Sequence, residues 1–177
     1  MFTRLSKFLT KPLMRKFYCS KIQPCLDYAD TIWMTCNKSQ RNDLQGQQNR
    51  AARIITKNYD YINHRGIEIA SELNLMTLQN RRNYRLTCLM FKCMHGLAPT
   101  YLTDRITLNC DIHEYGTRAA LNDDLYVPTA KTECLRKTFL YNGAITWNNL
   151  PVNLKQIPTL ECFKSSCFKH FMSLNSN

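Results

Sequence analysis

The carboxylates that come closest to a catalytic arrangement are in the string Asp27-Tyr28-Ala29-Asp30. A polymerase or nuclease needs two or more carboxylates that converge on Mg²⁺. Asp27 and Asp30 are three residues apart, Thr31 follows them, and no preceding strand supplies a partner carboxylate. We therefore interpret both aspartates as surface or hydrogen-bonding groups on a helix, and we predict no metal site here.

Cysteine and histidine also occur close together, in two sets. On a helix, residues i and i+5 diverge by about 140°, so neither set converges on one zinc ion. We predict core thiols beside exposed imidazoles. The sets are Cys88, Cys93 and His95, and Cys162, Cys167 and His170.

Serine, cysteine and histidine show no nucleophile elbow, and the five scattered glycines cannot form a phosphate-binding loop. We predict no catalytic residue, no cofactor and no small-molecule substrate, and hence no enzyme activity in this chain.

The charge balance points to a polyanionic partner. There are 24 Lys and Arg against 13 Asp and Glu, a formal net charge of +11. Nucleic acid is the commonest partner of so basic a domain, with an acidic membrane surface as the weaker alternative. No stretch reaches the roughly 18 apolar residues of a membrane span, and residues 1–22 lack the apolar core of a signal peptide. We read the nine cysteines as reduced and expect an intracellular protein, in the nucleus or the cytoplasm.

Hydrophobic periodicity predicts a chain of helices. Pro12 suits the first turn of the first helix, and Pro24 is expected to end it. Ser39 and Thr77 are predicted N-caps, the second of the longest helix, and Gly96 suits a left-handed C-cap. The expected helices cover residues 13–22, 26–34, 40–57, 67–73, 77–95, 139–151 and 160–174.

The predicted fold class is mainly α, a compact helical bundle with an irregular middle segment. Leu125, Tyr126 and Val127 have the pattern of a short strand, which Pro128 would place at a sheet edge. We predict a helical region over residues 1–103, an irregular connection over 104–137, and a C-terminal helical extension over 138–177.

Basic residues form stripes beside the apolar ones on two of these helices. Such stripes could contact phosphates, and each neutralised phosphate releases counterions, so binding would weaken with salt. An ordinary solvated face is the alternative for any single residue. The candidate nucleic-acid-binding residues are Arg50, Arg53, Lys57, Arg81, Arg85 and Lys92.

Several segments, taken in order, resemble the C-terminal part of non-LTR retrotransposon reverse transcriptases. The resemblance covers about residues 13–171 and depends on the order and spacing of the motifs. Its segments include YCSKIQPCLDYADTIW, LQGQQNRAARIIT, ELNLMTLQNRRNYRLTCLMFKCMHGLAPTYL and RKTFLYNGAITWNNLPVNLKQIPTLECFKSSCFKHF. The sharpest motifs are Gln48-Asn49-Arg50-Ala51-Ala52-Arg53, Gly96-Leu97-Ala98-Pro99 and Trp147-Asn148-Asn149-Leu150-Pro151.

The resemblance implies a thumb and a helical extension beyond it, which grip RNA or an RNA/DNA duplex through its backbone. It also implies that the palm, with its metal-binding aspartates, and the fingers lie outside this chain and would be its partners. The Cys-Cys-His-Cys knuckle of some members is absent here. Phe139, Tyr141 and Trp147 could stack on unpaired bases, although their spacing favours the core. Two alternatives stay open: a protein-interaction domain, and a transposon relic without function.

Overall fold

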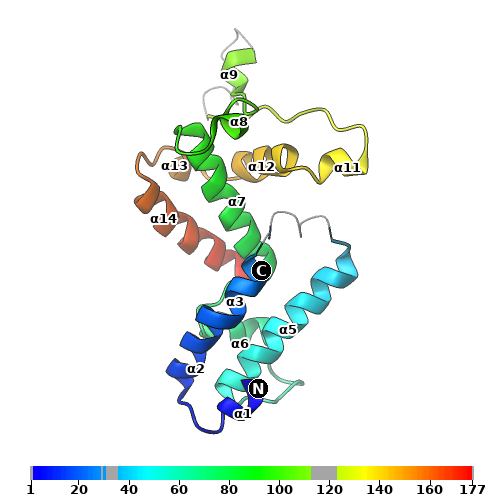
Figure 1. Ribbon diagram of the computed structural model, residues 1–177, viewed down its shortest axis with the longest axis vertical. Coiled ribbons are helices and arrows are strands. Elements are labelled where there is room, and N and C mark those ends of the chain that lie inside the picture. The colour runs from blue at the N-terminus through cyan, green and yellow to red at the C-terminus, as the bar shows by residue number, and fades with distance from the viewer. Residues whose placement is uncertain (1, 29, 31–35, 113–122, 177) are drawn as a thin grey trace. The chain divides into compact units, whose positions relative to one another are not determined.

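The computed structural model describes residues 2–28, 30, 36–112 and 123–176, and within them the fold is mainly α, as predicted (Figure 1). The helices of the first half are α1 (Phe2–Leu5), α2 (Lys11–Phe17), the π-helix η1 (Tyr18–Ile22), α3 (Gln23–Asp27), α5 (Lys38–Thr56) and α6 (Gly66–Glu72). Those of the second half are α7 (Leu78–Met94), α8 (Thr100–Thr103), α9 (Asn109–Ile112), α11 (Glu133–Arg136), α12 (Phe139–Asn148), α13 (Val152–Lys155), α14 (Leu160–Ser173) and the 3₁₀ helix η2 (Leu174–Ser176).

Contacts divide the chain into two compact units. Unit 1 consists of residues 1–82 and 171–177, and unit 2 of residues 83–170, so the division falls inside α7 and α14. The three-part division predicted from the sequence partitions the chain differently and stays a prediction. None of the described helices is both long and apolar enough to cross a membrane.

The prediction that Pro24 ends the first helix is wrong. Pro12 lies in the first turn of α2 as expected, but α2 continues through η1 into α3, and Pro24 lies in the first turn of α3. The wider π turn lets the Gln23 N–H donate to the Tyr18 carbonyl, five residues back. Proline at an early helical position needs no N–H partner, so the chain keeps its helical course there. The helix expected over residues 26–34 falls largely outside the described residues.

Helix α5 begins two residues earlier than predicted, because Asn37 and not Ser39 caps it. Asn37 Oδ1 accepts from the Gln40 N–H at 2.8 Å, and Gln40 Oε1 accepts from the Asn37 N–H at 3.2 Å. This reciprocal capping box satisfies two terminal N–H groups. The helix ends at Thr56, and its C-cap Lys57 has a left-handed φ of 57°. At 19 residues α5 is longer than the 17-residue α7, which the sequence analysis took as the longest helix.

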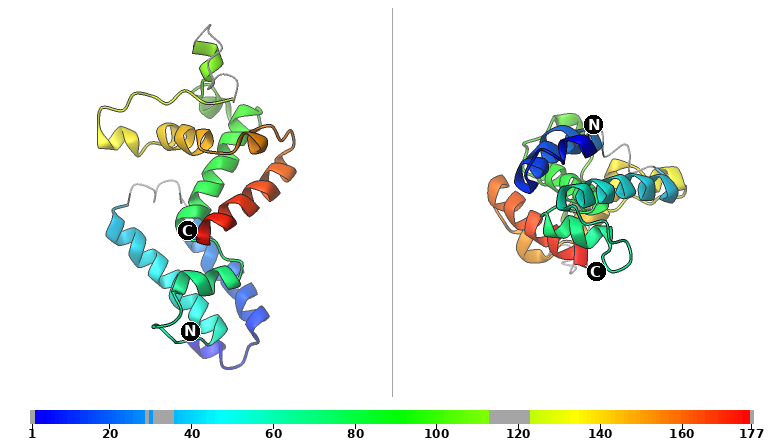
Figure 2. Two further views of the ribbon diagram at one scale, coloured as in Figure 1. Left: turned by 180° about the vertical axis from the view of Figure 1, so that it is seen from behind. Right: turned by 90° about the horizontal axis from the view of Figure 1, so that it is seen from below.

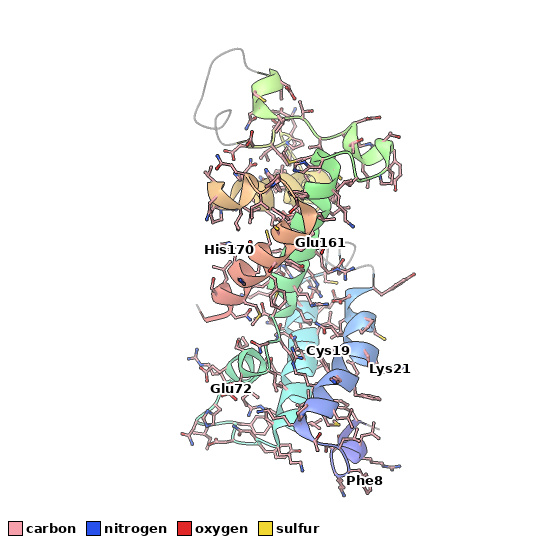
Figure 3. All side chains as sticks on the ribbon, turned by 90° about the vertical axis from the view of Figure 1, so that its left-hand side faces the viewer. Phe8, Cys19, Lys21, Glu72, Glu161 and His170 are labelled. Atoms are coloured by element: carbon pink, nitrogen blue, oxygen red, sulfur yellow. The ribbon has the colours of Figure 1, made fainter. Side chains whose placement is uncertain are left out.

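Unit 1 has its core between α2–η1, α5 and α6 (Figures 1 and 2). Figure 2 shows α6 packed across α5, and this approach is so close that a Cβ at Gly66 would lie 2.6 Å from Asn49 Cβ. Figure 3 shows Cys19 and Lys21 on different sides of η1; Cys19 packs on the core, and Lys21 is exposed. The buried core residues are Met14, Tyr18, Ala51, Ala52, Ile54, Ile55, Ile69, Ala70, Leu73 and Leu75.

Helix α7 has the caps expected of it. Thr77 Oγ1 accepts from the Asn80 N–H at 3.2 Å, and Gly96 has a φ of 67°. The Leu97 N–H donates to the Lys92 carbonyl at 2.8 Å, which closes the C-terminal turn around the left-handed glycine.

In unit 2, α7, α12 and α14 share an aromatic core. The Phe91 and Phe163 rings stack with centroids 4.3 Å apart, and Trp147 stacks on Phe163 at 5.8 Å. All three rings are almost fully buried. Cys88, Cys93 and Cys167 are buried, as predicted for apolar positions on helices. Cys162, which was also predicted to be a core thiol, is exposed instead.

The predicted strand at residues 125–127 is a single bridge between Leu108 and Leu125 among the described residues. The Asn148 side chain takes the place of a second partner strand. Its Oδ1 accepts from the Leu125 N–H and its Nδ2 donates to the Leu125 carbonyl, both at 2.8 Å. Because one side chain satisfies both backbone groups, no longer ladder is needed. The irregular middle segment also contains the short helices α9 and α11.

Candidate nucleic-acid interface

The positive charge is concentrated in unit 1. Unit 1 has 14 Lys and Arg against 6 Asp and Glu, a formal net charge of +8. Unit 2 has 10 against 7, a formal net charge of +3. A polyanion is therefore attracted mainly to unit 1.

Of the six predicted contact residues, four are in unit 1 and only two of these present an exposed charge. Arg50 and Lys57 are exposed at the C-terminal half of α5 and lie two turns apart, about 10 Å along the helix. Arg85, which is exposed, and Lys92, which is half-buried, belong to unit 2.

Arg53 is not a surface cation, contrary to the sequence prediction. Its side chain is 5% exposed, and its guanidinium donates to the Asp60 carbonyl at 2.7 Å and to the His64 carbonyl at 2.6 Å. The ring of Tyr61 lies 4.2 Å from the guanidinium carbon. The loop after α5 thus folds back over Arg53, which leaves its charge enclosed by backbone and unable to meet a phosphate.

Arg81 is also engaged within the protein. Its Nε and a terminal nitrogen donate to the two carboxylate oxygens of Asp27, both at 2.6 Å, in a two-pronged ion pair. The prediction that Asp27 makes hydrogen bonds is confirmed. Because Asp27 neutralises Arg81, this arginine is a poor phosphate ligand.

A different set of cations converges in unit 1, where α5 and α7 both begin. Lys38 and Arg41 from the first turns of α5 and Arg82 from α7 line a groove of about 440 Å³. The other lining residues are Asn42, Gln45, Ile67, Thr77, Leu78 and Gln79, none of them acidic. Both helices direct the positive ends of their dipoles here, which adds to the potential of the three cations.

Arg82 is the unusual member of this group. It is 5% exposed, and across the described parts of the chain its side chain has no hydrogen bond, ion pair or ring contact. Lys38 and Arg41 are exposed. The groove therefore has a recessed guanidinium below two accessible cations.

This groove was not predicted from the sequence, and none of Lys38, Arg41 and Arg82 is among the candidate contact residues. The local signals of the first two were a cap directly before Lys38 and a spacing of three residues to Arg41. What brings Arg82 to them is a tertiary contact, in which Gln45 Oε1 accepts from the Leu78 N–H at 2.9 Å.

The motifs behind the resemblance have structural roles in this chain. Gln48 is buried and donates to the Met76 carbonyl at 2.8 Å. Trp147 is buried and donates to the Asp123 carbonyl at 3.0 Å, so it belongs to the core and not to a stacking surface. Phe139 and Tyr141 line a cavity of about 510 Å³ in unit 2, together with Tyr101.

All nine cysteines are free thiols, and Cys88, Cys93 and Cys167 are buried. Burial, followed by the nearby Cys88 thiol, raises the pKa of Cys167 to about 12, and burial also raises the pKa of Cys93. Within the described residues, no three His, Cys, Asp or Glu side chains are grouped so that they could hold a metal ion.

No family model matches the chain, and neither a curated protein nor a solved structure is significantly similar to it.

Proposed function

We propose that this chain is the thumb and post-thumb region of a non-LTR retrotransposon reverse transcriptase, and that unit 1 binds RNA or an RNA/DNA duplex without sequence preference. The observation that supports binding most directly is the groove in which Lys38, Arg41 and Arg82 meet, with no carboxylate among the lining residues that the structure describes. The +8 charge of unit 1 and the exposed Arg50 and Lys57 extend the basic surface. The family assignment is supported by the order and spacing of the sequence motifs.

Contacts of this kind are made to phosphates. Lysine and arginine side chains on helix surfaces fix the position of a duplex and carry affinity, but they read no bases. In this proposal, catalysis belongs to a palm and fingers that are not in this chain and that are its protein partners. The chain alone would hold a template–primer and would not extend it.

Fluorescence anisotropy of a labelled RNA/DNA hybrid, titrated with the chain between 50 and 200 mM salt, tests this proposal. We expect the logarithm of the binding constant to fall with the logarithm of salt by about 0.9 for each phosphate neutralised. The double variant Lys38→Glu/Arg41→Glu should bind more weakly at every salt concentration, with a slope shallower by about 2. Arg50→Glu/Lys57→Glu tests the other exposed pair in the same way.

The matched control is Lys131→Glu/Arg136→Glu, which makes the same change of charge at exposed positions of unit 2. If the control loses as much affinity as the groove variant, binding follows net charge and no surface of unit 1 is involved. Absence of binding at 50 mM salt rejects the proposal for the chain as a whole.

The second candidate function is protein docking, and one observation favours it. The cavity of unit 2 is largely apolar, and Tyr101 and Leu135 on its border are 67% and 48% exposed. Exposed apolar surface of this kind marks contact sites. Sedimentation velocity would separate the two candidates, since self-association without affinity for the hybrid favours docking.

A further inference from the structure

The groove between the first turns of α5 and α7 contains a side chain whose burial needs an explanation. Arginine is almost never fully buried unless it is paired, because removing a charge from water is costly. Arg82 is 5% exposed and has no partner among the described residues, whereas the adjacent Arg81 has Asp27. Its guanidinium nitrogens are not among the fully buried polar atoms, so the charged end of this side chain opens to the groove, where an anion could meet it.

The groove limits where that anion can lie. Arg82 lines the same space as Lys38 and Arg41, which are exposed and accessible from solvent. The carboxylates nearest in sequence to the lining residues are Asp43 and Glu68, and neither lines the groove. Glu68 instead accepts from the Arg65 N–H at 3.1 Å as part of the cap of α6. Within the described parts of the chain, no carboxylate in the groove's lining therefore competes for the three cations.

The helix ends contribute electrostatic potential, while three of their first-turn N–H donors already have partners within the protein. In α7, the Leu78 N–H donates to Gln45 and the Asn80 N–H to Thr77; in α5, the Gln40 N–H donates to Asn37. Direct ligation of the anion falls to the side chains. Two guanidinium groups and one ammonium group match the oxygens of a tetrahedral phosphate, and the planar arginine fork can hold two oxygens at once.

We infer that this groove is a discrete site for one phosphate group, which Arg82 holds from below and Lys38 and Arg41 hold from the solvent side. The inference rests on the proposed function in one respect: the phosphate is taken to be that of a nucleic-acid strand. It can come from two sources, a terminal phosphate monoester or a diester within the strand.

Thermal unfolding of the purified chain with and without inorganic phosphate tests the site itself. The variant Arg82→Met keeps the apolar stem of the side chain and removes its charge. We expect phosphate to raise the Tm of the natural chain and to leave that of Arg82→Met unchanged. Without phosphate, Arg82→Met should melt no lower than the natural chain, because it removes a charge that has no partner and lies in a largely buried side chain.

Two further variants keep the test decisive. Arg82→Lys retains the charge on a similar stem and should retain part of the phosphate response, which covers the case in which Arg82→Met does not fold. Arg136→Met makes the same substitution at an exposed arginine of unit 2 and should respond to phosphate as the natural chain does. A full phosphate response in Arg82→Met, or none in the natural chain, overturns the inference.

Labelled 12-nucleotide RNAs that differ only in a 5′-phosphate or a 5′-hydroxyl distinguish the two sources. If the site takes a monoester, the phosphorylated strand binds the natural chain at least tenfold more tightly, and Arg82→Met binds both strands alike. If it takes a diester, the natural chain binds both strands equally tightly, and Arg82→Met binds both strands more weakly than the natural chain does. A phosphate response without affinity for either RNA supports the site and rejects the proposed function, whereas RNA binding without a phosphate response does the reverse.

Discussion

Replacing Arg53 by methionine separates a structural arginine from a nucleic-acid contact. Arg53 is buried at the end of α5, and its guanidinium donates to the backbone carbonyls of Asp60 and His64. Methionine can keep the packing of the stem, but it cannot satisfy either carbonyl. The loop of residues 57–65 would then lose the group that holds it against the helix.

The magnitude follows from these contacts. A hydrogen bond from a charged donor contributes about 1.5–3 kcal/mol, and the lower value applies here because the released loop can reach water. Two such bonds give about 3 kcal/mol, and the contact with the exposed Tyr61 ring adds about 0.5 kcal/mol. We expect Arg53→Met to destabilise unit 1 by about 3.5 kcal/mol, which lowers its Tm by at least about 14 °C.

Urea unfolding followed by circular dichroism measures this change, and hydrogen exchange in α5 assigns it to unit 1. The control is Arg50→Met, three residues earlier and exposed, which should change stability by no more than about 0.5 kcal/mol. A loss below about 1 kcal/mol in Arg53→Met would refute the reasoning. So would a stable Arg53→Met protein that binds the RNA/DNA hybrid more weakly than Arg50→Met, because Arg53 would then be a contact after all.

Three further predictions concern other parts of the molecule. Burial, followed by the nearby Cys19 thiol, raises the pKa of Tyr18 to about 12, so the folded state favours the neutral phenol. This contribution to stability is present below about pH 10 and is lost between pH 10 and 12, so the free energy of unfolding, measured over an alkaline pH series, should decline less steeply in Tyr18→Phe than in the natural chain. At pH 8, a thiol reagent should modify the exposed Cys25, Cys110, Cys134 and Cys162 quickly and Cys88, Cys93 and Cys167 only on unfolding; early modification of Cys167, read by peptide mass, would contradict its burial. Gly46→Ala should stabilise α5 by up to about 1 kcal/mol in urea unfolding, since nothing lies within 4 Å of the added Cβ. Gly143→Ala should instead destabilise the protein by about 1–3 kcal/mol, because its Cβ would lie 2.5 Å from Met90 Sδ, and equal effects of the two variants would contradict the packing of α12 on α7.

The sequence predicted the helices well wherever local signals decide them. Thr77 and Gly96 cap α7 as expected, and α14 begins within the predicted range, because caps and apolar periodicity depend on residues within a few positions. Local signals misled in three places. Ser39 was expected to cap α5, but Asn37 does so. Pro24 was expected to end a helix that continues through a π turn, and residues 125–127 had a strand pattern, but the Asn148 side chain serves as the partner of Leu125.

The candidate site shows even more clearly the difference between what local signals predict and what tertiary contacts decide. Helical spacing placed Arg50, Arg53 and Lys57 on one stripe, yet spacing cannot show that a loop folds back and encloses Arg53. It also cannot show that Asp27, 54 residues away, pairs with Arg81. Both outcomes depend on contacts between segments far apart in the chain, which no pattern along one helix contains.

By itself, the sequence determined the mainly α fold class, the caps of α7, the burial of Cys88, Cys93 and Cys167, and the strong excess of positive charge. These follow from composition and from neighbours along the chain. Only the tertiary structure decided which cations are accessible to a ligand. The contact between Gln45 and Leu78 holds the start of α7 against α5, and in the resulting groove Lys38 and Arg41 meet Arg82. A charge is available to a ligand only if no other part of the fold neutralises it, and that depends on the three-dimensional arrangement.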